Sequence, residues 1–128
     1  MTYGLHHIAL IVSDEAASIK FYKALGFEVR ARHERPEHHD VIVMMEGGGV
    51  VLEMFVDASH PPRVSGPEAM GLRHLGLSCV NASLVHEILV RTGYEPEPIR
   101  MDAFTGENMF FVKDPDGQPI EIHESAIG

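Results

Sequence analysis

The sequence predicts an α+β fold in which a βαβββ module occurs twice in tandem. The first observation is an internal repeat: residues 7–10 (HIAL) return as residues 74–77 (HLGL), and residues 26–28 (GFE) return as residues 93–95 (GYE) at the same spacing. The second is a stretch of helical periodicity before the glycine of each half, and the third is a set of strand-like apolar runs after it. Self-similarity at a fixed period indicates one supersecondary unit used more than once.

Each module should begin with a strand near its histidine and continue into a helix. In the first half we expect an N-cap at Asp14 and a C-terminal glycine at Gly26, and Asn81 and Gly93 occupy the matching places in the second half. Apolar side chains recur at helical spacing between the cap and the glycine. In the first half these are Ala16, Ile19, Phe21, Tyr22 and Leu25.

Three strands should follow each helix, the last of which contains a glutamate. Turn sequences join the final two strands of each half, GGG at residues 47–49 and DPDG at residues 114–117. The polar run over residues 33–40 predicts a solvated loop between strands, with a lid over the cavity as the alternative. The clearest strands are predicted at residues 41–45, 50–55, 109–113 and 119–123.

These elements predict an N-terminal module over residues 1–58, a linker over residues 59–71 and a C-terminal module over residues 72–128. The linker region has no hydrophobic period and carries several prolines and glycines. At roughly 60 residues, neither module can bury much surface alone. We therefore expect the two to pack as a single domain over residues 1–128, or to exchange modules between chains.

Composition narrows the classes of partner. The formal net charge of −9, from 10 basic and 19 acidic residues, leaves no basic stripe for nucleic acid. No apolar run approaches the roughly 20 residues of a membrane-spanning helix, and residues 1–10 lack the features of a signal peptide, so we expect a cytoplasmic protein without membrane contacts. The lone Cys79 cannot form an internal disulfide and is expected in the core. A small molecule is the expected ligand.

Two histidines and two glutamates repeat with the modules. His7 and His74 begin apolar strands, while Glu53 and Glu121 each interrupt an apolar run. A buried carboxylate costs several kcal/mol unless it is compensated. Taken singly, a strand histidine or glutamate is more often a hydrogen-bonded or edge residue than a metal ligand. A pseudo-twofold relation between the modules, however, would bring all four side chains to one point.

A divalent cation would remove the cost of placing these side chains together, because two neutral imidazoles and two carboxylates carry the charge that one such ion neutralises. This set of nitrogen and oxygen donors suits one ion of Zn, Ni, Co, Mn or Fe(II). Positions left open in a five- or six-coordinate ion favour catalysis. The sequence thus predicts a metal site made of His7, Glu53, His74 and Glu121.

The whole chain resembles the vicinal oxygen chelate superfamily, which groups glyoxalases, extradiol dioxygenases, epimerases and bleomycin or fosfomycin resistance proteins. The resemblance covers residues 3–125 and implies the paired-module, glyoxalase-like fold. Five segments carry it: residues 5–12 (LHHIALIV), 21–27 (FYKALGF), 51–54 (VLEM), 72–77 (LRHLGL) and 114–121 (DPDGQPIE).

The four-residue ligand set is most similar to that of glyoxalase I, the lactoylglutathione lyase. That resemblance implies a homodimer and a metal-dependent lyase or isomerase acting on the thiol adduct of a 2-oxoaldehyde. The metal would bind the adjacent hydroxyl and carbonyl oxygens, and an enediolate would form. Either Glu53 or Glu121 could be the base, and the family favours Glu121. The four ligands could come from one chain or from two chains of a dimer.

The sequence departs from the glutathione-binding pattern of glyoxalase I at two positions. Ile11 stands where the family has an arginine, and Asp57 where it has an asparagine. Another thiol, or none, is therefore expected. Candidate substrate contacts are His123, on the same strand face as Glu121, together with Arg100 and Arg63. Arg73 and Lys113 are further candidates.

Two other functions remain open. The polar residues could line a pocket without chemistry, as in drug-binding relatives of the bleomycin resistance kind. An Fe(II) dioxygenase is the third alternative, and Glu53 disfavours it because an oxygenase needs open positions for both substrate and O2.

Overall fold

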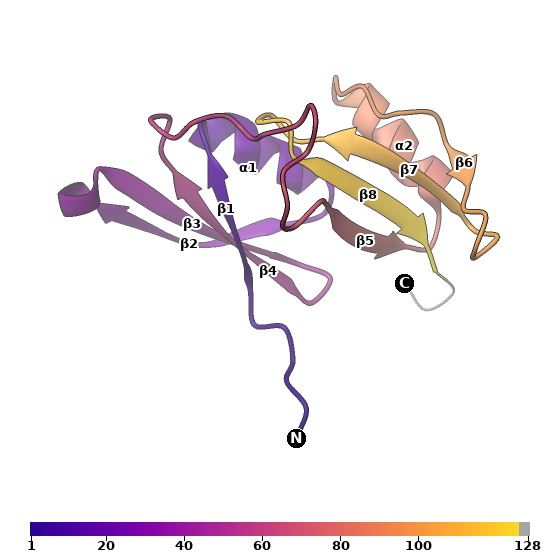
Figure 1. Ribbon diagram of the computed structural model, residues 1–128, viewed down its shortest axis with the longest axis horizontal. Coiled ribbons are helices and arrows are strands. Elements are labelled where there is room, and N and C mark those ends of the chain that lie inside the picture. The colour runs from indigo at the N-terminus through magenta and orange to yellow at the C-terminus, as the bar shows by residue number, and fades with distance from the viewer. Residues whose placement is uncertain (126–128) are drawn as a thin grey trace. The chain divides into compact units, whose positions relative to one another are not determined.

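Each half of the chain folds into one four-stranded mixed sheet with one α-helix, as the repeat predicts (Figure 1). The computed structural model describes residues 1–125. The chain divides into a first unit, Met1–Pro62, and a second unit that begins at Arg63. This boundary lies inside the predicted linker. The α+β class and the twofold use of a βαβββ module are confirmed, and the packing of both modules as a single domain stays a prediction.

The first unit orders its strands β1-β4-β3-β2, with β1 parallel to β4 and the remaining pairs antiparallel. A short 3-10 turn, η1, separates β2 from β3. The elements are β1 (Ile8–Val12), α1 (Glu15–Ala24), β2 (Glu28–Arg35), η1 (Pro36–His38), β3 (Asp40–Gly47) and β4 (Val50–Val56).

The second unit repeats this topology in the order β5-β8-β7-β6, again with its first strand parallel to its last. Its β6 strand is shorter than the matching β2. The elements are β5 (Leu75–Cys79), α2 (Ala82–Arg91), β6 (Arg100–Met101), β7 (Asn108–Lys113) and β8 (Pro119–Glu124).

Both helices begin and end as the sequence predicts. The Asp14 carboxylate accepts a hydrogen bond from the Ala17 N–H at 2.9 Å, and the Asn81 side chain accepts one from the Leu84 N–H at 3.1 Å. Gly26 and Gly93 follow the two helices with the same positive φ of 94°. A side chain would strain that conformation, so glycine is the residue that ends each helix.

The helix of each unit covers one face of its own sheet (Figure 1), and the opposite face, which that helix does not cover, is called the open face. Most of the buried strand residues lie on the covered faces, where alternate side chains point to the same side. Cys79, expected in the core, is half-buried in β5, and burial raises the pKa of its thiol. Fully buried apolar residues include Phe21, Tyr22, Val43, Met45, Leu52 and Met54 in the first unit, and Ala82, Leu89, Phe110 and Ile120 in the second.

The polar run over residues 33–40 is not the loop that the sequence predicted. His33 lies in β2 and pairs with Ile42 of β3, so the two strands extend almost to the turn. Only η1 and His39, which has a φ of 58°, form the connection. The strand is exposed and charged, which hides its β character from a periodicity argument.

None of the helices within residues 1–125 is long and apolar enough to cross a bilayer.

Candidate metal centre and substrate pocket

The open face of the first sheet carries a histidine and a glutamate in contact. His7 directly precedes β1, and Glu53 of β4 pairs in register with Ala9. Leu52 and Met54 on either side of Glu53 are buried on the helix-covered face, so the Glu53 carboxylate lies on the opposite, open face. The His7 Nε2 and Glu53 Oε1 atoms are 3.5 Å apart, and both side chains are partly exposed.

The second sheet repeats this arrangement. His74 directly precedes β5, and Glu121 of β8 pairs in register with Gly76, the residue that matches Ala9 in the first module. Ile120 and Ile122 are buried on the covered face, which leaves Glu121 on the open one. The His74 Nε2 and Glu121 Oε1 atoms are 3.2 Å apart. The structure therefore brings His7 to Glu53 and His74 to Glu121, one pair in each unit.

The spacing of each pair fits two ligands of one metal ion. Two donors that each lie about 2.0–2.2 Å from a zinc-sized ion are roughly 3.0–3.5 Å apart at octahedral or tetrahedral angles. The observed separations of 3.5 and 3.2 Å match that range. Within residues 1–125, no three His, Cys, Asp or Glu side chains gather closely enough to form a metal site. Each unit thus offers two donors.

A neighbouring histidine orients the first pair. The Nδ1 atoms of His6 and His7 lie 2.8 Å apart, so one ring donates a hydrogen bond to the other. A proton on His7 Nδ1 leaves the Nε2 lone pair free on the side of Glu53. No sequence motif indicates a role for His6. The sequence shows only that His6 directly precedes His7. The contact through which His6 sets the tautomer of His7 is seen only in the structure.

An aromatic ring orients the second pair. Phe111 of β7 pairs in register with Glu121, and its ring meets the His74 ring edge-on at a centroid distance of 5.0 Å. The guanidinium carbon of Arg100 lies 5.6 Å from the Phe111 centroid on the same open face. Sequence reasoning missed Phe111. The alternation of β7 and the antiparallel register would have identified it once the pairing with β8 was known.

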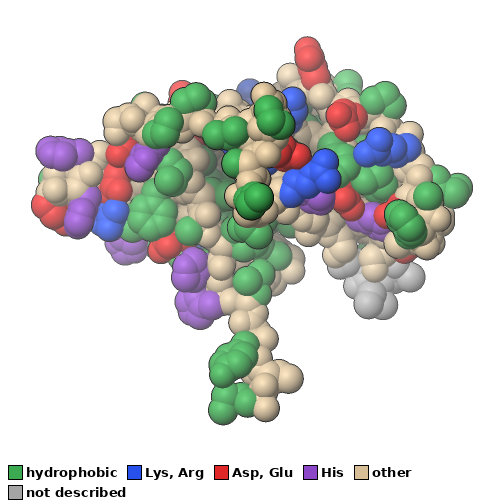
Figure 2. Space-filling model, viewed as in Figure 1, with side chains coloured by type: hydrophobic (Ala, Val, Ile, Leu, Met, Phe, Trp, Pro, Cys, Tyr) green, Lys and Arg blue, Asp and Glu red, His purple; other side chains and the backbone are tan. Residues whose placement is uncertain are grey.

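A pocket of about 690 Å³ lies in the second unit beside His74. Figure 2 shows basic, acidic and histidine side chains gathered over this part of the unit. The volume falls within the range of small-molecule sites, roughly 300–1,000 Å³. Its lining includes His74, Phe111, Pro119 and three cationic side chains, those of Arg73, Arg100 and Lys113.

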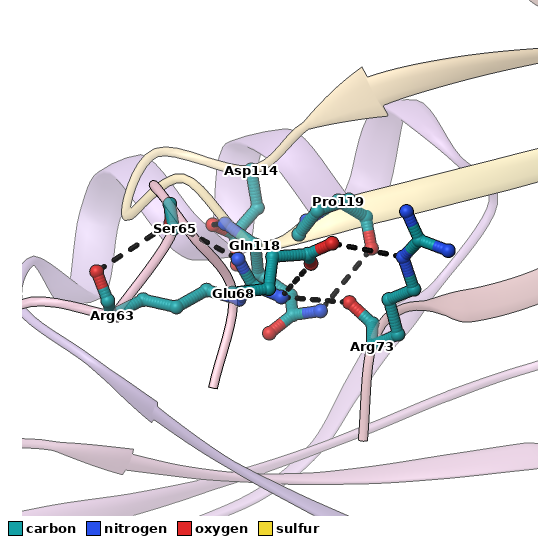
Figure 3. A network of polar contacts seen from close by, with 7 residues as sticks. All are labelled: Arg63, Ser65, Glu68, Arg73, Asp114, Gln118 and Pro119. Carbon is teal, nitrogen blue, oxygen red and sulfur yellow. Dashed lines mark hydrogen bonds and ion pairs between the residues drawn. The ribbon is translucent and has the colours of Figure 1, made fainter. Parts of the chain in front are cut away.

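One wall of the pocket is the loop over residues 63–73 (Figure 3). Arg63 donates to the Glu68 carboxylate at 2.7 Å and to the Arg73 carbonyl at 2.8 Å, while Arg73 Nε donates to Glu68 at 2.8 Å. These two guanidinium groups hold the pKa of Glu68 below its ordinary value. The network fixes Glu68 and Arg73 at the pocket.

The three candidate substrate residues have different surroundings. Arg100 lines the pocket. Arg63 is occupied by the loop network and by a hydrogen bond to Ser65. His123 is held by Asp102 at 3.0 Å and by the Glu124 carbonyl at 2.8 Å. That carbonyl and the Asp102 carboxylate raise the pKa of His123.

Fold and side chains together define a class of protein made of paired βαβββ modules, each with a histidine and a glutamate in contact on its open face. The family model of the Glyoxalase/Bleomycin resistance protein/Dioxygenase superfamily matches residues 4–122, and the chain belongs to this family. The predicted membership of the vicinal oxygen chelate superfamily, with its tandem-module fold, is confirmed. Members typically bind a divalent metal, bind small molecules and are often dimeric.

Relatives at different distances support this membership. The uncharacterized protein YwkD of Bacillus subtilis is 38% identical in an alignment of 123 positions that covers 94% of this chain and 96% of the relative. The crystal structure of a glyoxalase family protein from Enterococcus faecalis has 43% identity and a TM-score of 0.88, covering 94% of this chain and 97% of that one. The trypanothione-dependent glyoxalase I of Leishmania major, at 24% identity and a TM-score of 0.74, covers 96% and 87% and shares the fold.

Proposed function

We propose that the protein is a metal-dependent lyase or isomerase of the glyoxalase I type. It would convert the hemithioacetal of a 2-oxoaldehyde and a thiol into a 2-hydroxyacyl thioester. The observation that carries this proposal is the recurrence of one His–Glu pair, at ligand spacing, in each of two repeated modules. Both pairs lie on the faces away from the helices, outside the buried cores of their units.

In this proposal His7, Glu53, His74 and Glu121 hold one divalent ion, which would be zinc, nickel, cobalt, manganese or iron. The two pairs would come from one chain or from two chains of a homodimer. Two imidazoles and two carboxylates balance the charge of the ion, and they provide no thiolate that would favour a closed structural site. When bound, the ion would supply Lewis acidity toward adjacent oxygens of the substrate.

The chain's own residues would move one proton. We propose Glu121 as the base, because its partner His74 lines the pocket of the second unit. Its carboxylate takes the proton from C1, and that bonding pair moves between C1 and C2 as negative charge develops on the C2 oxygen. Glu121 then returns the proton to C2, while the hydroxyl proton of C1 moves to the C2 oxygen. The reaction is an isomerisation with no net redox change.

The thiol of the substrate is proposed to differ from glutathione. Ile11 has an exposed side chain on β1 and supplies no cation. Asp57 accepts hydrogen bonds from Ser59, which lower the pKa of its carboxyl, and it also lies 3.5 Å from His60. A carboxylate at this position repels the carboxylates of glutathione. The fold also carries a trypanothione-dependent enzyme, so it does not dictate glutathione.

The pocket also favours a second candidate function, that of a small-molecule binding protein. A cavity of about 690 Å³ lined by Phe111, Pro119 and charged groups could bind a ligand without chemistry. This candidate predicts tight ligand binding to metal-free protein and no turnover with any thiol adduct. The lyase proposal predicts turnover that depends on the metal.

The experiment is a turnover assay with methylglyoxal and a panel of thiols, each tested with zinc, nickel, cobalt, manganese and iron(II). Glu53→Gln and Glu121→Gln should each lower turnover by roughly 100-fold or more, the scale of general acid–base catalysis. Glu28→Gln is the matched control, since it removes the same charge from an exposed position on β2. Full activity in both site variants would refute the proposal.

A further inference from the structure

One arginine of the second unit differs from every other arginine in its surroundings. Within residues 1–125, Arg100 is the arginine that has no carboxylate partner, although acidic residues outnumber basic ones in this chain. Its Nε donates to the Met109 sulfur at 3.3 Å, and its guanidinium lies over the Phe111 ring. The paired arginines are Arg30, Arg32, Arg35, Arg63, Arg73 and Arg91.

The position of Arg100 in the pocket indicates a role for its positive charge in binding a ligand. It lines the pocket beside His74, and the Phe111 ring contacts both side chains. The ring centroid is 5.6 Å from the guanidinium carbon and 5.0 Å from the imidazole centroid. Because both groups contact the same ring, one small molecule can reach them together. The aromatic face and the sulfur hold the guanidinium in place but leave its terminal N–H groups available.

We infer that Arg100 binds a carboxylate of the substrate, so that the thiol portion of the proposed hemithioacetal is a small monocarboxylate. This inference rests on the proposed function for the identity of the reacting end. A guanidinium recognises a planar carboxylate through two parallel hydrogen bonds, which fixes its orientation as well as its position. Lys113, a second pocket cation with an exposed side chain, adds attraction for the same group.

The other charges of the pocket limit the substrate to a single negative group. The basic side chains there are matched by an equal number of acidic ones, and Arg73 is already bonded to Glu68. A polyphosphate would meet repulsion from these carboxylates, while one carboxylate at Arg100 would not require more positive charge. The acidic residues of the lining are Glu68, Glu95 and Glu97.

The test compares two thiols that differ in one group, 3-mercaptopropionate and 3-mercapto-1-propanol. Binding to metal-free protein is followed by backbone amide NMR shifts over residues 100–101 and 109–113. Turnover of their methylglyoxal adducts is followed in the metal-loaded protein. We expect the carboxylate thiol to bind roughly tenfold more tightly than the alcohol, the scale of one charge-assisted hydrogen-bond pair. Its adduct should show a correspondingly lower KM.

Arg100→Gln should abolish this preference in both assays, and Arg100→Lys should restore part of it. Arg91→Gln is the matched control, because it removes the same charge from a surface position on α2 where Arg91 pairs with Glu87. Equal binding of the two thiols to wild type, or a preference unchanged in Arg100→Gln, would overturn the inference. Loss of turnover with every thiol alongside a retained, Arg100-dependent binding preference would refute the proposed reaction and support the carboxylate site.

Discussion

Phe110 and Phe111 are neighbours in β7 that face opposite sides of the second sheet, and replacing each by leucine separates stability from site geometry. Phe110 is fully buried, and its ring lies against the ring of His86 on α2 at a centroid distance of 5.0 Å. Phe111 is partly exposed and contacts His74 and Arg100 on the open face. The two variants therefore make the same chemical change in two different environments.

The structure predicts a larger loss of stability for Phe110→Leu than for Phe111→Leu. Phe110→Leu removes ring atoms from a closed core and should lower the free energy of unfolding by about 1–2 kcal/mol, since buried residues cannot relax fully around a missing group. For a chain of this length that is a decrease of about 4–10 °C in Tm. Phe111→Leu should cost less than about 1 kcal/mol, because water already reaches that ring.

Metal affinity should fall more in Phe111→Leu than in Phe110→Leu, the reverse of the order for stability. Phe111→Leu removes the ring that orients His74, and loss of such a supporting contact lowers metal affinity by roughly tenfold. Phe110→Leu should leave that affinity within about twofold of wild type, since additivity holds for groups without shared partners. Urea unfolding and calorimetric titration with zinc measure the two quantities. A larger loss of zinc affinity in Phe110→Leu than in Phe111→Leu would refute this reasoning.

Two further predictions concern the repeat and the loop beside the pocket. Asp14→Ala and Asn81→Ala should each lower stability by about 1 kcal/mol, because both remove a side-chain cap of the same geometry, and thermal unfolding by circular dichroism should detect a loss in both. Glu68 has its pKa lowered from 4.5 by Arg63 and Arg73, so its contribution to stability is complete above that value and is lost as the pH falls through the lower folded-state pKa. Urea unfolding between pH 6 and 3 should therefore show a steeper loss in wild type than in Glu68→Gln, and parallel curves would contradict the assignment.

The sequence predicted the repeated architecture well because its signals are local. Helix caps at Asp14 and Asn81 and the glycines after each helix act within a few residues, so their chemistry can be read along the chain. The interruption of an apolar run likewise singled out Glu53 and Glu121, although their place on the face away from the helix is known only from the structure. The strand through His33 was missed because an exposed edge strand lacks the alternating apolar pattern.

The surroundings of the site were less predictable because they depend on contacts between distant segments. The pairing of Arg63 with Glu68 and Arg73 turns part of the predicted linker into a wall of the pocket. The isolation of Arg100 can be recognised only when the partners of every other arginine are known. Phe111 acquires its place beside His74 from the antiparallel register of β7 and β8.

The central claim is that the two His–Glu pairs hold one metal ion, and metal content per chain tests it most directly. Untagged wild type would be compared by mass spectrometry with the His7→Ala/His74→Ala double variant. A His38→Ala/His39→Ala variant controls for adventitious binding at the turn between β2 and β3. The account predicts about one divalent ion per four-ligand site in wild type and in the control, and none in the site variant. Equal metal content in wild type and the site variant would contradict it.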